Sequence, residues 1–336
     1  FAVAVMPLLG VGGMQLFKAE VPGPIADKLT PRIAVTARRL WLIYVGLTAT
    51  QWLSLCLAGM PGFAALCHAF STISTGGFST RDASVAGFDS VLIEWVVIAF
   101  MTLGGINFVL HYRLLSGRVA VALRDAELRY FALLLMGSAL AIHWSMRDAL
   151  EPSGFRAALF QVVSIATTTG FATADFEDWP AIALLILLQL MVLGGMAGST
   201  SGGVKSLRVL IGMRALANVF ARLGHRGAVA HPVRYAGKRV SDEVLAGVWA
   251  FLTAYFLLAA AVAGAVAASG YDFETSISAA LTCIGNVGPG LGEVGPFDNF
   301  SHFPVSVKLT LCLAMIAGRL ELFTILILFH RDFWQR

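Results

Sequence analysis

The chain has 336 residues, of which 57% are hydrophobic and only 13% are charged, and its mean hydropathy is +0.77. A soluble domain carries about 25% charged residues, so this composition excludes an ordinary soluble protein and indicates an integral membrane protein. The formal net charge is +4, and the four cysteines lack the spacing of a zinc site or a disulfide framework.

Six apolar runs are long enough to cross a bilayer core, which takes about 20 residues each. In chain order they lie at 37–59, 90–115, 129–147, 180–211, 242–269 and 304–330. A seventh run at 1–16 has the character of a helix that began before Phe1. We therefore expect the chain to lack its natural N-terminus.

Charge orients these runs across the membrane. The segments 17–39, 113–129, 205–243 and 330–336 hold 19 Lys/Arg against 7 Asp/Glu, whereas 60–94, 144–179 and 271–308 hold 4 against 12. The two sets alternate, as the positive-inside rule requires of cytoplasmic and external segments. The basic stretch 214–240 could alternatively be interpreted as a nucleic-acid-binding surface. Cytoplasmic loops are routinely this basic, however, and we expect no nucleic-acid partner.

Each external segment contains a short helical pattern followed by a polar turn that contains glycine. The patterns are PGFAALCHAFSTIS, GFRAALFQVVSIAT and FETSISAALTCIGN. The turns align as Ser74-Thr75-Gly76-Gly77-Phe78, Thr167-Thr168-Thr169-Gly170-Phe171 and Gly285-Asn286-Val287-Gly288-Pro289. A span precedes and follows each turn, so the unit of helix, half-helix, glycine turn and helix occurs three times.

Such turns have a physical reason to line a pore. Irregular backbone at membrane depth is tolerated only where it is buried in protein or lines a water-filled cavity. Gly77, Gly170 and Gly288 allow backbone angles that a β-carbon forbids, so consecutive carbonyls can point toward one monovalent cation. The negative dipole end of each half-helix then also points toward the ion. The alternative is three unrelated re-entrant or extracellular loops.

Four such units close a ring better than three. We therefore expect an all-α membrane protein with repeated helix–pore-helix–filter loop–helix units in pseudo-fourfold arrangement, of which this chain supplies three. In the expected organisation, 1–16 ends the missing first repeat, and 37–115, 129–211 and 242–330 are the second, third and fourth repeats.

Several stretches, taken together and in order, resemble a known family. They are MPLLGVGGMQLFKAEVPGP, STISTGGFST, NFVLHYRLLSGR, SIATTTGFATADF, GGMAGSTSGGVKSLRV, NVGPGLG and GRLELFTILILF. They resemble the TrkH/TrkG-type subunits of bacterial potassium uptake systems, in the superfamily that also holds KtrB and the plant HKT transporters. The resemblance implies four units per subunit, transported K⁺ with no organic cofactor, a homodimer, a cytoplasmic nucleotide-binding TrkA-type partner, and a place among the lipids of the bacterial cytoplasmic (inner) membrane. The chain departs from it by lacking the first span and the filter of the first unit.

On that resemblance, filter roles fall on one group of residues in each turn: Thr75, Gly76 and Gly77; Thr168, Thr169 and Gly170; Asn286, Val287 and Gly288. The K⁺ ligands are expected at Thr75, Gly76, Thr168, Thr169, Asn286 and Val287. In the plant relatives, serine in place of the first filter glycine is associated with sodium transport, so a sodium-conducting or sodium-coupled transporter is the alternative. A membrane hydrolase would need a Ser–His or carboxylate pair at one depth, whereas these polar residues repeat with the architecture; we expect no enzyme.

The stretch GGMAGSTSGGVKS at 194–206 interrupts the run 180–211 with small and polar residues. It either packs helices closely through small residues or unwinds under the filter and obstructs the cytoplasmic pore mouth, and the resemblance favours such a gating loop at 194–204. The expected gate and cavity residues are Gly194, Gly195, Gly198, Ser199, Thr200, Ser201, Gly202, Gly203, Lys205 and Arg319. The stretch nearly spells a phosphate-binding loop, but Val204 separates Gly203 from Lys205 and no predicted strand precedes it.

Two basic residues of this set have competing interpretations. A mid-membrane arginine costs about 2.5–3.5 kcal/mol on insertion scales, which makes Arg319 a functional candidate. We expect it to face the pore cavity below the filter; the alternative is a structural contact with carbonyls of the intramembrane loop. Lys205 is either a topology anchor or a contact near the gate.

Overall fold

The fold is known from a computed structural model that describes residues 33–147, 154–224, 232–235, 238–320 and 322. The expected remnant of a first repeat at 1–16 and the end of the run 304–330 lie outside the described residues.

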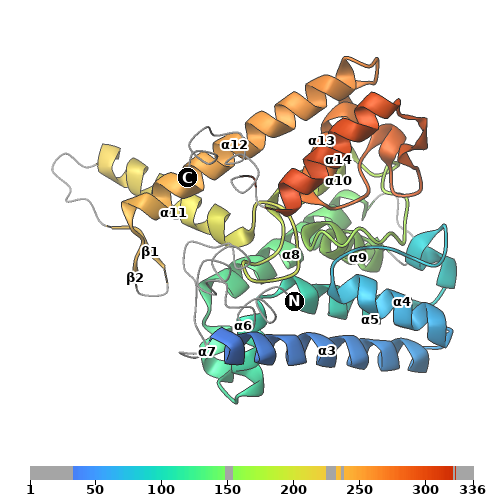
Figure 1. The fold of residues 1–336 in the computed structure, drawn as a ribbon, viewed down its shortest axis with the longest axis horizontal. Helices are drawn as coiled ribbons and strands as arrows, with labels where there is room; N and C mark the ends of the chain where they lie inside the picture. Colours follow the sequence, from blue (N-terminus) through green and yellow to red (C-terminus); the bar gives the residue numbers. More distant parts are fainter. Residues whose placement is uncertain (1–32, 148–153, 225–231, 236–237, 321, 323–336) are drawn as a thin grey trace.

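The α-helices (Figure 1) are α3 Ile33–Leu57, α4 Gly62–Ile73, α5 Val91–Gly105, α6 Phe108–Leu115, α7 Val119–Leu123, α8 Ala126–Ser145, α9 Gly154–Ala166, α10 Ala181–Leu193, α11 Ser206–Gly224, α12 Asp242–Ala267, α13 Phe273–Gly285 and α14 Val305–Arg319. Short 3₁₀ turns are η2 Ser84–Phe88, η4 Gly292–Val294 and η5 Phe300–His302. The expectation of a helical fold is confirmed, with one addition: strands β1 Arg234–Tyr235 and β2 Lys238–Arg239 pair antiparallel.

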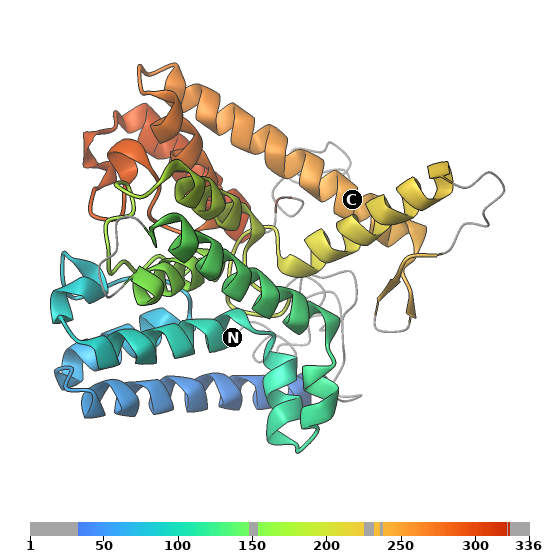
Figure 2. The same ribbon diagram turned by 180° about the vertical axis from the view of Figure 1, so that it is seen from behind.

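The helices come in three successive groups of the same kind: α3–α4–α5, α8–α9–α10 and α12–α13–α14. In each group the short middle helix contacts the long helix before it and the helix after it. Figures 1 and 2 show α12–α14 on one side of the molecule and α3–α5 on the other, with α8–α10 between them. The short helices α4, α9 and α13 are the helical patterns that the sequence predicts before the three turns.

Local chemistry explains where several of these helices begin. Ser90, Asp125, Ser241 and Asp272 each stand before a helix and accept hydrogen bonds from N–H groups of its first turn, as N-cap residues do. Prolines precede α4, α10 and α14. The short helices α4 and α13 therefore start at a defined residue, and each ends where its turn begins.

In the described part of the chain, α3, α8 and α12 are long and apolar enough to cross a membrane, and a fourth span results if α5 and α6 are taken as one. The run 90–115 is not the straight helix that its hydropathy predicts, because α5 and α6 are bent by 103°. The bend follows Gly105, where an added Cβ would meet Thr167 Cγ2 at 2.7 Å, and Asn107 accepts a hydrogen bond from Val109 N–H to start α6. The run 180–211 is broken too, at the glycine-rich stretch that the sequence marks.

Of the short helices, α9 and α13 are largely buried inside the protein, whereas α4 exposes Phe63 and Phe70 on one face. In α9 every residue from 158 to 166 is buried, and α13 is buried almost continuously from 275 to 285. Around them, apolar side chains such as Phe131, Phe160 and Leu187 form a core between the first two groups, while Tyr255 and Leu311 belong to a second core in the last group. Because lipid is as apolar as these side chains, close packing rather than exclusion of water stabilises this arrangement.

Candidate ion filter and intramembrane loop

The three pore helices end in the same backbone turn. A residue just after the end of each helix is left-handed: φ is 52° at Thr75, 55° at Thr168 and 55° at Asn286, which is the C-cap of α13. The next N–H bonds the carbonyl five residues back in each case, in the pairs Gly76–Ser71 at 2.7 Å, Thr169–Ser164 at 2.8 Å and Val287–Thr282 at 2.9 Å. This is the Schellman geometry that closes a helix C-terminus.

Two of these left-handed residues are threonines, which is unusual. The position is normally taken by glycine or asparagine, and a β-branched residue there is a conformational outlier. Such strain costs of order 1–3 kcal/mol and persists only where the surroundings enforce it, typically at functional sites. Thr75 and Thr168 are both buried, with 4% and 1% of their surface exposed, so the surrounding protein holds them in this conformation.

The third residue of each turn is a glycine with positive φ: 69° at Gly77, 86° at Gly170 and 115° at Gly288. A Cβ on Gly77 would lie under 3.0 Å from the carbonyl oxygen of Thr169, and one on Gly170 equally close to the carbonyl oxygen of Val287. Gly77 and Gly170 therefore each let their turn lie directly against a carbonyl of the next turn. The three predicted filter segments come together in chain order.

The segment that leaves each turn is held to the short helix before it by side-chain hydrogen bonds. Ser164 Oγ donates to Phe171 O at 2.6 Å, and Thr282 Oγ1 donates to Pro289 O at 2.9 Å. After the first turn, His68 of α4 makes the corresponding contact, since its Nε2 lies 3.0 Å from Ser79 Oγ. Sequence reasoning missed His68, although it precedes the left-handed residue by the same seven positions as Gln161, which bonds Ala174 O at 3.2 Å.

The predicted loop at 194–204 lies against the ends of all three pore helices. Thr200 Oγ1 donates to Ile73 O, the last residue of α4, at 2.8 Å. Gly202 N–H donates to Thr168 Oγ1 at 2.6 Å, and a Cβ on Gly202 would lie under 3.0 Å from Gly285 O, at the end of α13. The loop is thus unwound, as expected, and adjoins the three turns.

Other members of the predicted gate set shape the loop itself. Three glycines have positive φ: Gly194, Gly198 and Gly203. The carbonyl oxygen of Gly195 accepts a hydrogen bond from Ser206 N–H, and Ser199 Oγ donates one to Met196 O. The Ser201 side chain is buried. Lys205 is buried as well, and its Nζ donates to Ser201 O. This contact with the loop favours the second of the two interpretations of Lys205.

Arg319 contacts the intramembrane loop. Its Nη1 donates to Thr200 O at 3.1 Å. The guanidinium is therefore engaged by a carbonyl of the intramembrane loop, which is the structural alternative, and it joins the end of α14 to the segment beneath the turns. Hydropathy alone could not predict this contact, because the two residues are 119 positions apart.

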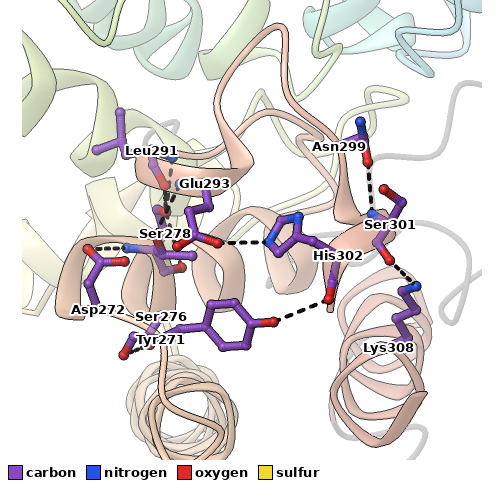
Figure 3. A network of polar contacts seen from close by, with 11 residues as sticks. Tyr271, Asp272, Ser276, Ser278, Leu291, Glu293, Asn299, Ser301, His302 and Lys308 are labelled. Atoms are coloured by element: carbon purple, nitrogen blue, oxygen red, sulfur yellow. Dashed lines mark hydrogen bonds and ion pairs between the residues drawn. The ribbon is translucent and has the colours of Figure 1, made fainter. Parts of the chain in front are cut away.

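The segment after the third turn is held by a polar network beside α13 (Figure 3). Ser278 Oγ donates to Leu291 O at 2.8 Å, Glu293 lies 3.3 Å from His302 Nε2, and Tyr271 donates to His302 O. These residues border an open cavity of about 600 Å³, lined by Asp272, Thr275, Gly292, Glu293, Asp298 and His302. Acidic residues therefore collect beside the third turn, where a negative potential attracts cations.

Glu177 extends this acidic surface from the second turn. Burial, together with the nearby carboxylates of Asp175 and Asp298, raises the pKa of Glu177 to about 7. Its Oε1 packs against Gly295, in the segment that follows the third turn. Repulsion among these carboxylates is relieved when Glu177 holds a proton.

Comparison with known proteins agrees with this architecture. The family described as TrkH, cation transport protein, matches residues 1–336. The Trk system potassium uptake protein TrkH of Salmonella typhimurium is 43% identical over 341 residues, which is 99% of this chain and 70% of that protein. The corresponding TrkH and TrkG proteins of Escherichia coli K12 are 42% and 39% identical.

A solved structure has the same fold. The crystal structure of the potassium transporter TrkH from Vibrio parahaemolyticus is similar with a TM-score of 0.85 at 37% sequence identity, covering 99% of this chain and 69% of that one. The match extends over the pore helices, the turns and the intramembrane loop alike, because it covers nearly the whole chain. This chain belongs to the TrkH family of cation transport proteins.

Proposed function

We propose that this chain moves potassium ions across the bacterial cytoplasmic membrane, and that the three left-handed turns are its selectivity filter. The ions would shed water at the backbone carbonyls of Thr75, Gly76, Thr168, Thr169, Asn286 and Val287, since carbonyl oxygens can replace the hydration shell of a monovalent cation. The printed names of the relatives, potassium uptake proteins, support the choice of ion. The reaction is transport and involves no covalent chemistry.

One observation carries the proposal: the three turns share one strained backbone conformation and lie against one another through glycines. Unrelated loops would have no reason to share it. In this proposal the segments 37–115, 129–211 and 242–330 are the second to fourth units of a pseudo-fourfold pore, and 1–16 ends the first. The loop at 194–204 is the gate below the filter, held by Arg319.

The assembly completes the proposal. Two such subunits form a homodimer, and the basic cytoplasmic segments dock a nucleotide-binding TrkA-type subunit. A channel-like or a gradient-coupled mechanism would use the same filter.

The test is rubidium and sodium uptake into proteoliposomes that contain the full-length protein or its Gly170→Ser variant. Because Gly170 has a φ of 86° and adjoins Val287 O, the substitution must displace that carbonyl and relax selectivity toward sodium. Gly270→Ser is the matched control, with a φ of 94° and no atom within 4 Å of an added Cβ. Equal uptake of both ions, unchanged by Gly170→Ser, would show that the turns are structural, and uptake of sodium alone would select the sodium alternative.

A further inference from the structure

Glu127 is a buried carboxylate that the proposed filter and gate leave without a role. It is the second residue of α8, at the end of that apolar helix, and only 2% of its surface is exposed. An ionisable residue is costly to bury without a partner, so it is expected to have a specific one. Sequence reasoning counted Glu127 only as one charge of a cytoplasmic segment.

The partners of Glu127 are the two limbs of the intramembrane loop. Its Oε1 accepts a hydrogen bond from Ala197 N–H at 2.7 Å, where the loop enters, and another from Ser206 Oγ at 2.8 Å, where α11 begins. A backbone hydrogen bond from Ser206 N–H to Gly195 O, at 2.9 Å, joins the same two ends, which form the base of the loop. One oxygen atom of α8 therefore holds both ends of the loop.

The loop needs such an anchor. Five of the twelve residues from 194 to 205 are glycines, which lose more conformational freedom on ordering than any other residue. Its tip carries the contacts beneath the filter: Thr200 to Ile73 O, and Gly202 N–H to Thr168 Oγ1. Two hydrogen bonds to one buried carboxyl oxygen fix the base of the loop, and this restricts where the tip can lie.

We propose that Glu127 is a positioning residue that clasps the base of the intramembrane loop to α8 and so holds the loop tip under the filter. The inference rests on the proposed function of that loop as a gate. Two contacts then hold the loop where it obstructs the pathway: the contact between Glu127 of α8 and the base of the loop, and the contact from Arg319. Weakening the clasp releases the tip without altering the carbonyls of the turns.

The experiment compares Glu127→Gln, Ser206→Ala and the double variant in the full-length protein. Glu94→Gln is the matched control: Glu94 also lies in the first turn of a membrane helix and is 15% exposed, but its partner is Arg156, at 2.6 Å, away from the loop. Rubidium and sodium uptake into proteoliposomes gives the gating readout. A cysteine introduced at Ser199, tested with a water-soluble thiol reagent against the chain without it, gives the position of the tip.

We expect Glu127→Gln to raise rubidium uptake about three- to tenfold with an unchanged rubidium-to-sodium ratio, because an amide carries no negative charge and accepts the two hydrogen bonds more weakly than a carboxylate. Ser206→Ala should give a smaller rise, and the rise in the double variant should be smaller than the product of the two single rises, since both act through one oxygen. The reagent should label position 199 faster. A merely structural role would lower uptake with the amount of folded protein and would not raise it.

Uptake and labelling that match those of Glu94→Gln would overturn the inference, as would uptake that falls in every variant while labelling stays constant. If the unsubstituted protein takes up no rubidium, the proposed function fails, and the labelling still decides the clasp. Faster labelling of position 199 in Glu127→Gln then supports it, and an unchanged rate refutes it.

Discussion

The contact between Thr168 Oγ1 and the N–H of Gly202 is the most direct link between the filter turns and the loop, and a single oxygen atom can be removed from it. Thr168→Val keeps the shape and the β-branch but leaves the Gly202 N–H unpaired in a buried place, at a cost of about 1–3 kcal/mol. If this cost falls on the blocking position of the loop, the equilibrium shifts toward the released position by about 5- to 150-fold.

Thr75→Val is a closely matched control. Thr75 has nearly the same left-handed φ, 52° against 55°, and similar burial, but its Oγ1 donates only to Ser74 O in its own turn. Any general effect of replacing a strained threonine by valine is therefore common to both variants.

The assay is rubidium and sodium uptake into proteoliposomes at equal protein content. Thr168→Val should increase uptake at least about threefold relative to Thr75→Val, since even the lower cost shifts the loop equilibrium about fivefold. The ratio of rubidium to sodium should stay the same in both, because the backbone carbonyls are untouched. Equal uptake in the two variants would refute the reasoning that this hydrogen bond holds the loop in place.

Three further outcomes are expected. Gly77→Ala should abolish the preference for rubidium over sodium in uptake assays, because its Cβ would collide with Thr169 O, whereas Gly59→Ala, with a φ of 93° and open space around it, should keep the preference. Burial and neighbouring carboxylates raise the pKa of Glu177 from 4.5 to about 7, so between these pH values the folded protein binds a proton that the unfolded chain releases. The free energy of unfolding therefore falls as the pH rises through this window. Glu177→Gln should make the melting temperature in detergent less dependent on pH, and an unchanged dependence would contradict the assignment. Arg156→Met leaves the carboxylate of its 2.6 Å ion pair unpaired and should lower the melting temperature, by a loss of about 1–3 kcal/mol.

The local features of this fold were open to prediction from the sequence because short-range chemistry determines them. The half-helix and turn patterns are contiguous, and the positive φ values at Gly77, Gly170 and Gly288 occur where the aligned glycines stand. The unwound loop could be predicted for the same reason, since its small and polar residues interrupt an otherwise apolar run.

What the sequence did not disclose depends on residues far apart in the chain. The partners of Arg319 and Glu127 lie 119 and 70 positions away, so no window of hydropathy contains both members of either pair. The bend between α5 and α6 was missed because the mean apolarity of 90–115 carries no information on backbone direction. A signal was nevertheless present, in the glycine pair Gly104-Gly105 followed by the capping residue Asn107.

The shared turn also bears on how such a protein can change over evolutionary time. Threonine occupies the left-handed position in two turns and asparagine in the third, yet the hand of the backbone is the same in all three. The residue type at this position can therefore change while the left-handed conformation stays the same. Asparagine adopts that conformation with less strain than threonine. Distant relatives would then be recognised by the alternating signs of φ along the turn, even where a search for the letters TTG finds nothing.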